Sequence, residues 1–170
     1  MSFYSTNLFP EFPDHSKVWI YQADRFLDEQ VSTEIQAKVD SFTREWSAHK
    51  LHVKASGLLL ENLFLILVAN ETDVTVSGCS IDSSVRFIKE LEQTYQLSFF
   101  NRMKIAYRDG DKLRVDDAFE LLQKINSGAI NSDLYVFNNT IQKLEDLKTK
   151  WLVPIADSWL GARIEKIMAQ

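Results

Sequence analysis

The apolar residues of the first fifty positions fall into two patterns. Residues 17–23 form a short β-branched and aromatic run, which predicts a strand. After Asp24 and Asp28, either of which suits a helix cap, apolar residues recur every three or four positions and predict a helix to about residue 46. The apolar stripe of this helix consists of Val31, Ile35, Val39, Phe42 and Trp46.

An almost continuously apolar segment follows, and Glu61–Asn62 interrupts it. This pattern predicts two strands, over about 51–60 and 63–70, that are joined by a tight turn, with a buried helix as the alternative. A turn signal comes next, and the helical spacing of apolar residues over 81–95 predicts a second helix.

The second half of the chain contains a clear hairpin signal. Asp109–Gly110–Asp111 separates two strand-like runs, 103–107 and 112–115, and Asp-Gly supplies the positive φ values that a hairpin turn requires. The elements expected after it are a helix from Asp116 or Asp117 to about Asn126, a strand over 134–137, a helix from Asn139 or Thr140 to Lys150, and a closing helix over 156–168 with Trp159, Ile164, Ile167 and Met168 in the core.

This order of elements predicts an α+β fold with a mainly antiparallel sheet. The opening β-α-β-β-α resembles a ferredoxin-like unit, for which 103–107 is the candidate fourth strand, and an α/β extension follows it. Residues 1–16, rich in aromatic residues and proline, are expected to form an irregular arm. Residues 17–170 are then a single domain, with a split into subdomains near residue 100 as the alternative.

Composition narrows the classes of function. The chain has 170 residues and a formal charge of −5, with no run of Lys or Arg longer than one residue, so nucleic acid is not an expected partner. Its longest apolar run, Leu63–Ala69, is far shorter than the roughly 20 residues of a membrane-spanning helix, so membrane insertion is not expected either. Cys79 is the only cysteine, which indicates a reducing, cytoplasmic setting.

Residues 77–84 (SGCSIDSS) form the most unusual stretch, where a strand or turn is expected to enter a helix. Free N–H groups at a helix start can bind a small anion, and a cysteine there can become a reactive thiolate. The candidate ligand-binding residues are Ser77, Gly78, Cys79, Ser80, Ser83, Ser84 and Arg86. The alternative is structural, because serine and aspartate are good helix caps and a lone cysteine packs as a small apolar residue.

Several named chemistries are excluded by spacing. A cysteine phosphatase loop has five residues between Cys and Arg, whereas six separate Cys79 from Arg86. No glycine precedes a lysine, so there is no Walker A loop, and there is no Gly-x-Gly-x-x-Gly motif. His49 and His52 lack a third metal ligand. We therefore expect no metal, no cofactor and no assigned catalytic residue.

The aromatic content suggests an interface. Four tryptophans and eleven phenylalanines exceed what one small core requires. Trp151 and Trp159, together with the arm, are expected either to form an exposed patch or to cover the edge of the sheet. An exposed patch would favour a homodimer.

Several segments resemble a family of short bacterial proteins that often carries the label "ABC transporter ATPase". They are 18–25 (VWIYQADR), 77–93 (SGCSIDSSVRFIKELEQ), 99–111 (FFNRMKIAYRDGD), 136–139 (VFNN) and 153–159 (VPIADSW). The resemblance covers about residues 17–163 and implies no activity, and ATP hydrolysis is not transferred because the Walker A lysine is missing. Residues 112–137 are also loosely similar to small interaction modules that end in Gly-x-Ile-x-x-Asp, here Gly128–Asp133.

Two hypotheses follow. In the first, the chain is a non-enzymatic protein that acts through protein–protein contacts, with a homodimer or another protein as partner. In the second, it binds a small anion or is an enzyme that uses the Ser77–Ser84 loop. The first is preferred because the chain lacks a recognisable catalytic constellation.

Overall fold

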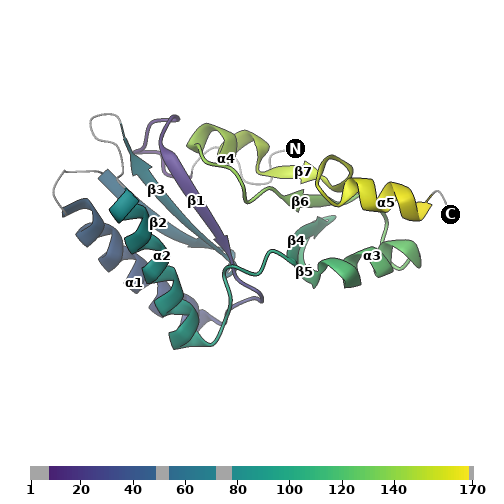
Figure 1. Ribbon diagram of the computed structural model, residues 1–170, viewed down its shortest axis with the longest axis horizontal. Helices are drawn as coiled ribbons and strands as arrows, with labels where there is room; N and C mark the ends of the chain where they lie inside the picture. Colours follow the sequence, from purple (N-terminus) through teal and green to yellow (C-terminus); the bar gives the residue numbers. More distant parts are fainter. Residues whose placement is uncertain (1–7, 49–53, 72–77, 169–170) are drawn as a thin grey trace.

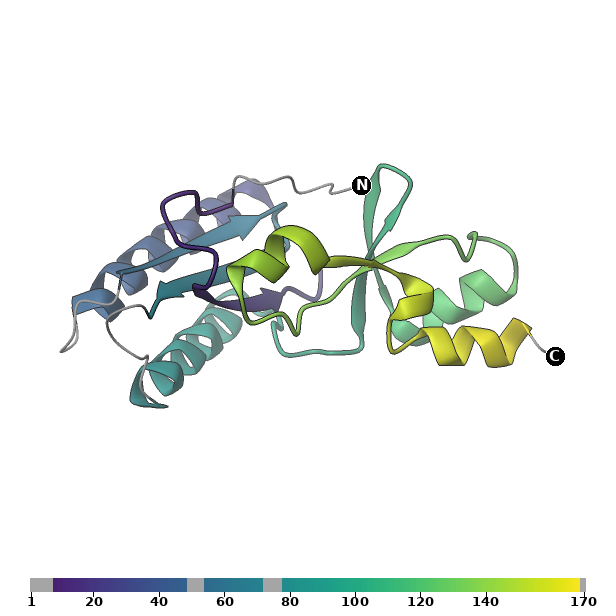
Figure 2. The same cartoon turned by 90° about the horizontal axis from the view of Figure 1, so that it is seen from above.

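The computed structural model describes residues 8–48, 54–71 and 78–168 and shows an α+β fold with two antiparallel sheets. The first sheet has the strand order β1-β3-β2, and the second has the order β5-β4-β6-β7. The two sheets lie at opposite ends of an elongated molecule (Figures 1 and 2). The predicted α+β class and antiparallel pairing are therefore confirmed.

The strands and helices follow each other in an order close to that predicted. They are β1 (Lys17–Gln22), α1 (Glu29–Ala48), β2 (Lys54–Leu60), β3 (Phe64–Asn70), α2 (Gly78–Tyr95), β4 (Lys104–Asp109), β5 (Lys112–Asp117), α3 (Ala118–Asn126), β6 (Tyr135–Phe137), α4 (Leu144–Lys150), β7 (Leu152–Pro154), the 3₁₀ turn η1 (Ile155–Asp157) and α5 (Gly161–Met168).

The first sheet is covered on both faces, which explains why β3 is apolar at almost every position. On one face α1 and α2 lie side by side, and Leu67 of β3 points toward α1. On the other face Phe64 packs against Phe137 and Trp151, with ring centroids 4.6 and 4.8 Å away. A strand that is buried on both faces loses the alternation of apolar and polar residues.

Close packing of α1 on β2 depends on a glycine and a glutamine. A Cβ atom at Gly57 would lie 2.4 Å from Cγ1 of Val39, so only glycine lets the helix approach this near. The Gln36 side chain of α1 donates to the Gly57 carbonyl (3.1 Å) and accepts from the Leu59 N–H (2.8 Å). This amide therefore satisfies backbone groups of β2 and fixes the helix against the strand.

The second sheet begins with the predicted hairpin. Gly110 has a φ of 57°, as the Asp-Gly turn requires. Of the two aspartates proposed as caps, Asp117 caps α3, and its carboxylate accepts from the Phe119 N–H at 3.0 Å. Helices α3 and α5 pack against this sheet (Figure 1) and bury Leu121 and Ile164.

A chain of side-chain amides joins the two sheets. The Trp151 indole N–H donates to Asn139 Oδ1 (3.0 Å), and Asn139 Nδ2 donates to Gln22 Oε1 (3.0 Å). Gln22 Nε2 then donates to the backbone carbonyl of Lys104 at the start of β4 (2.9 Å). We call Gln22, Asn139 and Trp151 the amide relay.

The ferredoxin-like arrangement is not confirmed, because the candidate fourth strand belongs to the second sheet. Strand β4 pairs with β5 and β6. The outer edge of β1 instead meets the segment before α4. The Val18 N–H donates to the Gln142 carbonyl (3.0 Å), and the Leu144 N–H donates to the Ser16 carbonyl (2.9 Å). For the same reason, the helix predicted from Asn139 or Thr140 begins only at Leu144.

The closing helix also begins later than predicted. Residues 155–157 form a 3₁₀ turn and α5 begins at Gly161, so the core at this end contains Ile155 and Leu160. Trp159 was predicted either in the core of the closing helix or in an exposed patch or edge cover; its side chain is 53% exposed, so the core position is wrong. Trp151, predicted as part of an exposed patch or an edge cover, is instead 2% exposed. Phe9 and Phe12, from the predicted arm, are buried in the main core.

Candidate functional site

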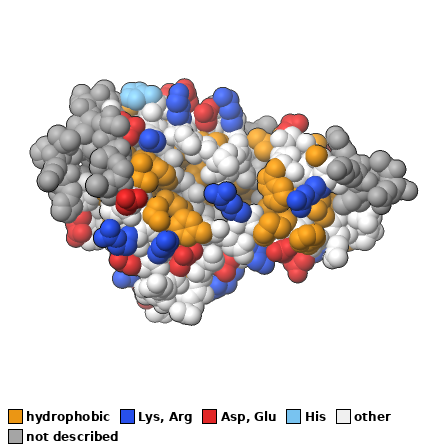
Figure 3. All heavy atoms as spheres, viewed as in Figure 1, with side chains coloured by type: hydrophobic (Ala, Val, Ile, Leu, Met, Phe, Trp, Pro, Cys, Tyr) orange, Lys and Arg blue, Asp and Glu red, His pale blue; other side chains and the backbone are white. Residues whose placement is uncertain are grey.

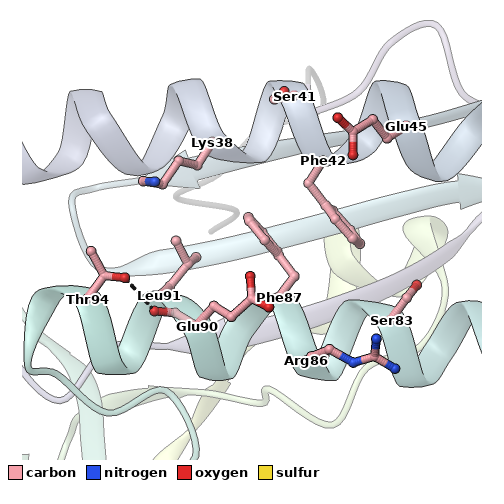
Figure 4. A pocket seen from close by; sticks show the side chains of 10 residues that line it. All are labelled: Lys38, Ser41, Phe42, Glu45, Ser83, Arg86, Phe87, Glu90, Leu91 and Thr94. Atoms are coloured by element: carbon pink, nitrogen blue, oxygen red, sulfur yellow. Dashed lines mark hydrogen bonds between the residues drawn. The ribbon is translucent and has the colours of Figure 1, made fainter.

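A groove of about 360 Å³ runs between the outer sides of α1 and α2 (Figure 4). The two helices run antiparallel: along the groove, the residue numbers of α1 and of α2 rise in opposite directions. It is lined by Lys38, Ser41, Phe42, Glu45, Ser83, Arg86, Phe87, Glu90, Leu91 and Thr94.

The floor of the groove is aromatic. Phe42 and Phe87 stack face to face, with centroids 4.3 Å apart and an angle of 2° between the rings. Phe42 also stacks on Trp46 (5.5 Å), which in turn meets Trp19 of β1 edge-on (5.4 Å). A row of four rings therefore reaches from the sheet to the surface, and its outer pair remains only half-buried.

Four charged side chains line the rim. Lys38 and Glu90 lie near one end of the groove, and Glu45 and Arg86 lie near the other (Figure 4). All four residues are exposed. No ion pair within 4.0 Å connects any two of them in the described part of the chain. We call these four residues the rim quartet.

Of the seven predicted ligand-binding residues, three have described side chains, and two of these reach the groove. Ser83 and Arg86 line it. Ser84 points to the core, where its hydroxyl donates to the Ile81 carbonyl at 2.7 Å. Burial raises the pKa of the nearby Tyr21 phenol, and a hydrogen bond with Ser84 opposes that shift.

The remaining candidates lie at the start of α2. Gly78, Cys79 and Ser80 form its first turn, and their side chains are outside the described residues, as is the whole of Ser77. The predicted entry into a helix is confirmed at Gly78. The two predictions for Cys79, a buried apolar side chain or a reactive thiolate, therefore concern a side chain outside the described residues.

Sequence reasoning missed the half of the groove that belongs to α1. Lys38 and Glu45 were not among the predicted site residues, and Phe42 was expected only in the apolar stripe of its helix. The spacing did contain a signal, because Phe42 and Phe87 stand at positions where an apolar stripe borders a polar face. Their pairing could not be read from either helix alone.

A second hollow, of about 480 Å³, lies beside the outer end of β1. It is lined by His15, Lys17, Glu71, Asn138, Thr140, Ile141, Gln142, Lys143, Asp146 and Lys150. Lys17 pairs with Glu71 (3.8 Å), and Lys150 pairs with Asp146 (2.8 Å). Lys143 pairs with Glu145 (3.5 Å), so carboxylates offset all three of its lysines. Neither Ser83 nor Arg86 lines this hollow.

A polar cluster surrounds a buried tyrosine of the second sheet. The fully buried Tyr107 donates to Asp116 Oδ2 at 2.5 Å, and Lys124 of α3 contacts the same oxygen at 2.7 Å. Burial and the Asp116 carboxylate raise the pKa of Tyr107 well above its usual range. A phenol held in this way keeps its proton at neutral pH. These residues line neither hollow, so the cluster acts in the core of the second sheet.

No protein-family model, curated protein or solved structure matches the chain. In the described ranges, no three His, Cys, Asp or Glu residues gather closely enough to hold a metal ion. No helix in those ranges is both long and apolar enough to cross a membrane.

Proposed function

We propose that this chain is a non-enzymatic protein that acts through protein–protein contact, with the groove between α1 and α2 as its contact surface. The half-buried Phe42–Phe87 stack, bordered by the exposed charges of the rim quartet, carries this proposal. Interfaces typically combine an aromatic centre, which provides most of the binding free energy, with a polar rim that excludes water.

The charges of the groove disfavour the alternative, in which Ser83 and Arg86 bind a small anion. Glu45 and Glu90 line the same groove as Lys38 and Arg86, so the formal charge of the rim quartet is zero. The whole chain has a charge of −5, which also repels anions. An anion would depend on local geometry at the first turn of α2.

A reducing, cytoplasmic setting belongs to the same proposal. It is supported by the single Cys79, which cannot form an internal disulfide bond. Membership of the short bacterial family rests on the quoted segments alone and adds no activity to the proposal.

A photo-crosslinking amino acid in place of Ser41 tests the contact surface in the cells that make the protein. Ser41 lies on the groove and is exposed, so a bound protein should be captured there as an adduct of higher mass. Position 30, an exposed glutamine on α1 that does not line the groove, is the matched control. Equal or absent capture at both positions would contradict the proposal.

Thermal-shift measurements with inorganic phosphate and ATP test the alternative. The contact proposal predicts no stabilisation by either. A stabilisation that the Ser80→Ala, Ser83→Ala double variant abolishes would instead establish the anion-binding hypothesis.

A further inference from the structure

We infer that the groove is occupied by a second copy of this chain, related by a two-fold axis that runs along the groove, so that α1 of each copy faces α2 of the other. This inference rests on the proposed function and names its partner. The order of the rim charges carries it.

The rim quartet is self-complementary. Along α1 a positive residue, Lys38, precedes a negative one, Glu45, two helical turns later. Along the antiparallel α2, Arg86 lies near the Glu45 end and Glu90 near the Lys38 end (Figure 4). A two-fold axis along the groove places the same ends of the two grooves together and sets α1 of one copy against α2 of the other.

In that arrangement every rim charge meets an opposite charge. Lys38 of one copy faces Glu90 of the other, and Glu45 faces Arg86, and the symmetry repeats both pairs. The four side chains form no ion pair among the residues that the structure describes, so no such pair has to break for these contacts to form. Opposite charges arranged across an interface fix its register and suppress other arrangements.

The aromatic floor supplies the apolar centre of the same interface. The axis passes over Phe42 and Phe87, so the half-buried rings of both copies meet at the middle of the groove. Figure 3 shows apolar side chains bordered by both positive and negative ones on the part of the surface that α1 and α2 occupy. This pattern resembles an interface core with a charged rim.

The size of the helical face suits a dimer. Helix α1 has 20 residues and α2 has 18, which at 1.5 Å per residue correspond to lengths of roughly 30 and 27 Å. Two helices side by side span roughly 20 Å. Such a face is of the order of the roughly 800 Å² that each partner buries in a stable complex.

One other two-fold axis also pairs opposite charges, and the test must distinguish it. An axis that crosses the groove places α1 against α1, so that Lys38 faces Glu45 of the second copy, and Arg86 faces Glu90. Reversing both charges of one helix separates the two arrangements, because only the inferred one pairs α1 with α2.

The experiment uses two charge-reversed variants of the full chain, Lys38→Glu with Glu45→Lys on α1 and Arg86→Glu with Glu90→Lys on α2. Sedimentation velocity at low salt measures the dimer dissociation constant of each variant and of their equimolar mixture. We expect the wild type to dimerise and each variant alone to have a dimer dissociation constant at least roughly tenfold higher. The equimolar mixture should form a one-to-one heterodimer with the dissociation constant of the wild type.

The control reverses charges on α1 outside the groove. Glu29→Lys with Arg44→Glu alters two exposed residues and should leave the dimer unchanged. Circular dichroism of all variants confirms that each is folded. Because every substituted side chain is exposed, we expect the folds to be preserved.

Three results would overturn the inference. A wild type that remains monomeric at all accessible concentrations excludes the second copy, and an adduct of a different mass at position 41 would then leave the proposed function intact. Variants that each dimerise like the wild type but form no heterodimer with each other point to the crossing axis. Variants that dimerise like the wild type both alone and in the mixture place the interface elsewhere.

Discussion

The two sheets differ in how deeply their strands are buried. Six of the seven residues of β3 in the first sheet are buried, whereas the second sheet buries three residues of β4 and none of β5. The first sheet lies between two helices on one face and the aromatic residues Phe137 and Trp151 on the other. The free energy of unfolding should therefore depend more on the first sheet, while the second tolerates change.

The sheets nevertheless share contacts. Phe64 of β3 touches Phe137, the last residue of β6, and Arg108 of β4 pairs with Glu61 of the β2–β3 turn at 3.2 Å. The amide relay adds a polar connection beside these contacts. We therefore expect the two sheets to unfold in one cooperative transition, although their strands never pair with each other in the described residues.

The largest expected effect comes from removing the aromatic side chain at the junction. Phe64→Ala should lower the free energy of unfolding by about 3–5 kcal/mol, because it leaves a cavity between Phe137 and Trp151. Leu113→Ala, on the half-buried edge strand β5, should lower it by only about 1 kcal/mol. Urea unfolding of both variants measures the difference, and similar losses would show that the second sheet is as critical as the first.

A smaller effect is expected from breaking the amide relay. Asn139→Leu removes the hydrogen bonds that Asn139 makes with the Trp151 indole N–H and the Gln22 side-chain oxygen, and the loss of a buried hydrogen-bond partner costs about 1–3 kcal/mol. We expect a loss of about 2–3 kcal/mol in urea unfolding. Asn131→Leu, at an exposed asparagine in the loop before β6, is the matched control. A loss of unfolding free energy no larger than that of the control would show that the relay does not help to join the two sheets.

The predictions that rested on local chemistry were confirmed at particular residues. Asp28 accepts from the Val31 N–H at 2.8 Å, as expected of a cap of α1, and the turn at Gly110 has its expected positive φ. The uninterrupted apolar run of β3 was also predicted as a strand. In each case residues close together in the sequence determine the local structure, so the sequence pattern alone predicts it.

The predictions that failed depended on distant contacts. Helical spacing places Ile141 and Leu144 on one stripe, yet residues 141–143 do not become helical because the β1 edge binds this segment. Trp151 and Trp159 look alike in the sequence, but only Trp151 has an indole partner in the core. The groove depends even more on distant contacts, since its two sides come from helices that two strands separate in the sequence.

The smallest expected effect lies in the buried cluster of the second sheet. Tyr107→Phe removes one hydrogen bond to Asp116, which keeps its contact with Lys124, so we expect a loss of about 1–2 kcal/mol at neutral pH. The pH dependence is more specific. Because burial and Asp116 raise the pKa of Tyr107 in the folded state, the folded chain retains a proton that the unfolded chain releases above about pH 10.

Stability should therefore fall as the pH rises beyond about 10 more steeply in the wild type than in Tyr107→Phe, so the difference between them shrinks. Urea unfolding on both sides of that pH measures it, with Tyr135→Phe, at a more exposed tyrosine on β6, as the control. Parallel pH profiles would show that the phenol ionises equally in the folded and unfolded states and would contradict the raised pKa of Tyr107.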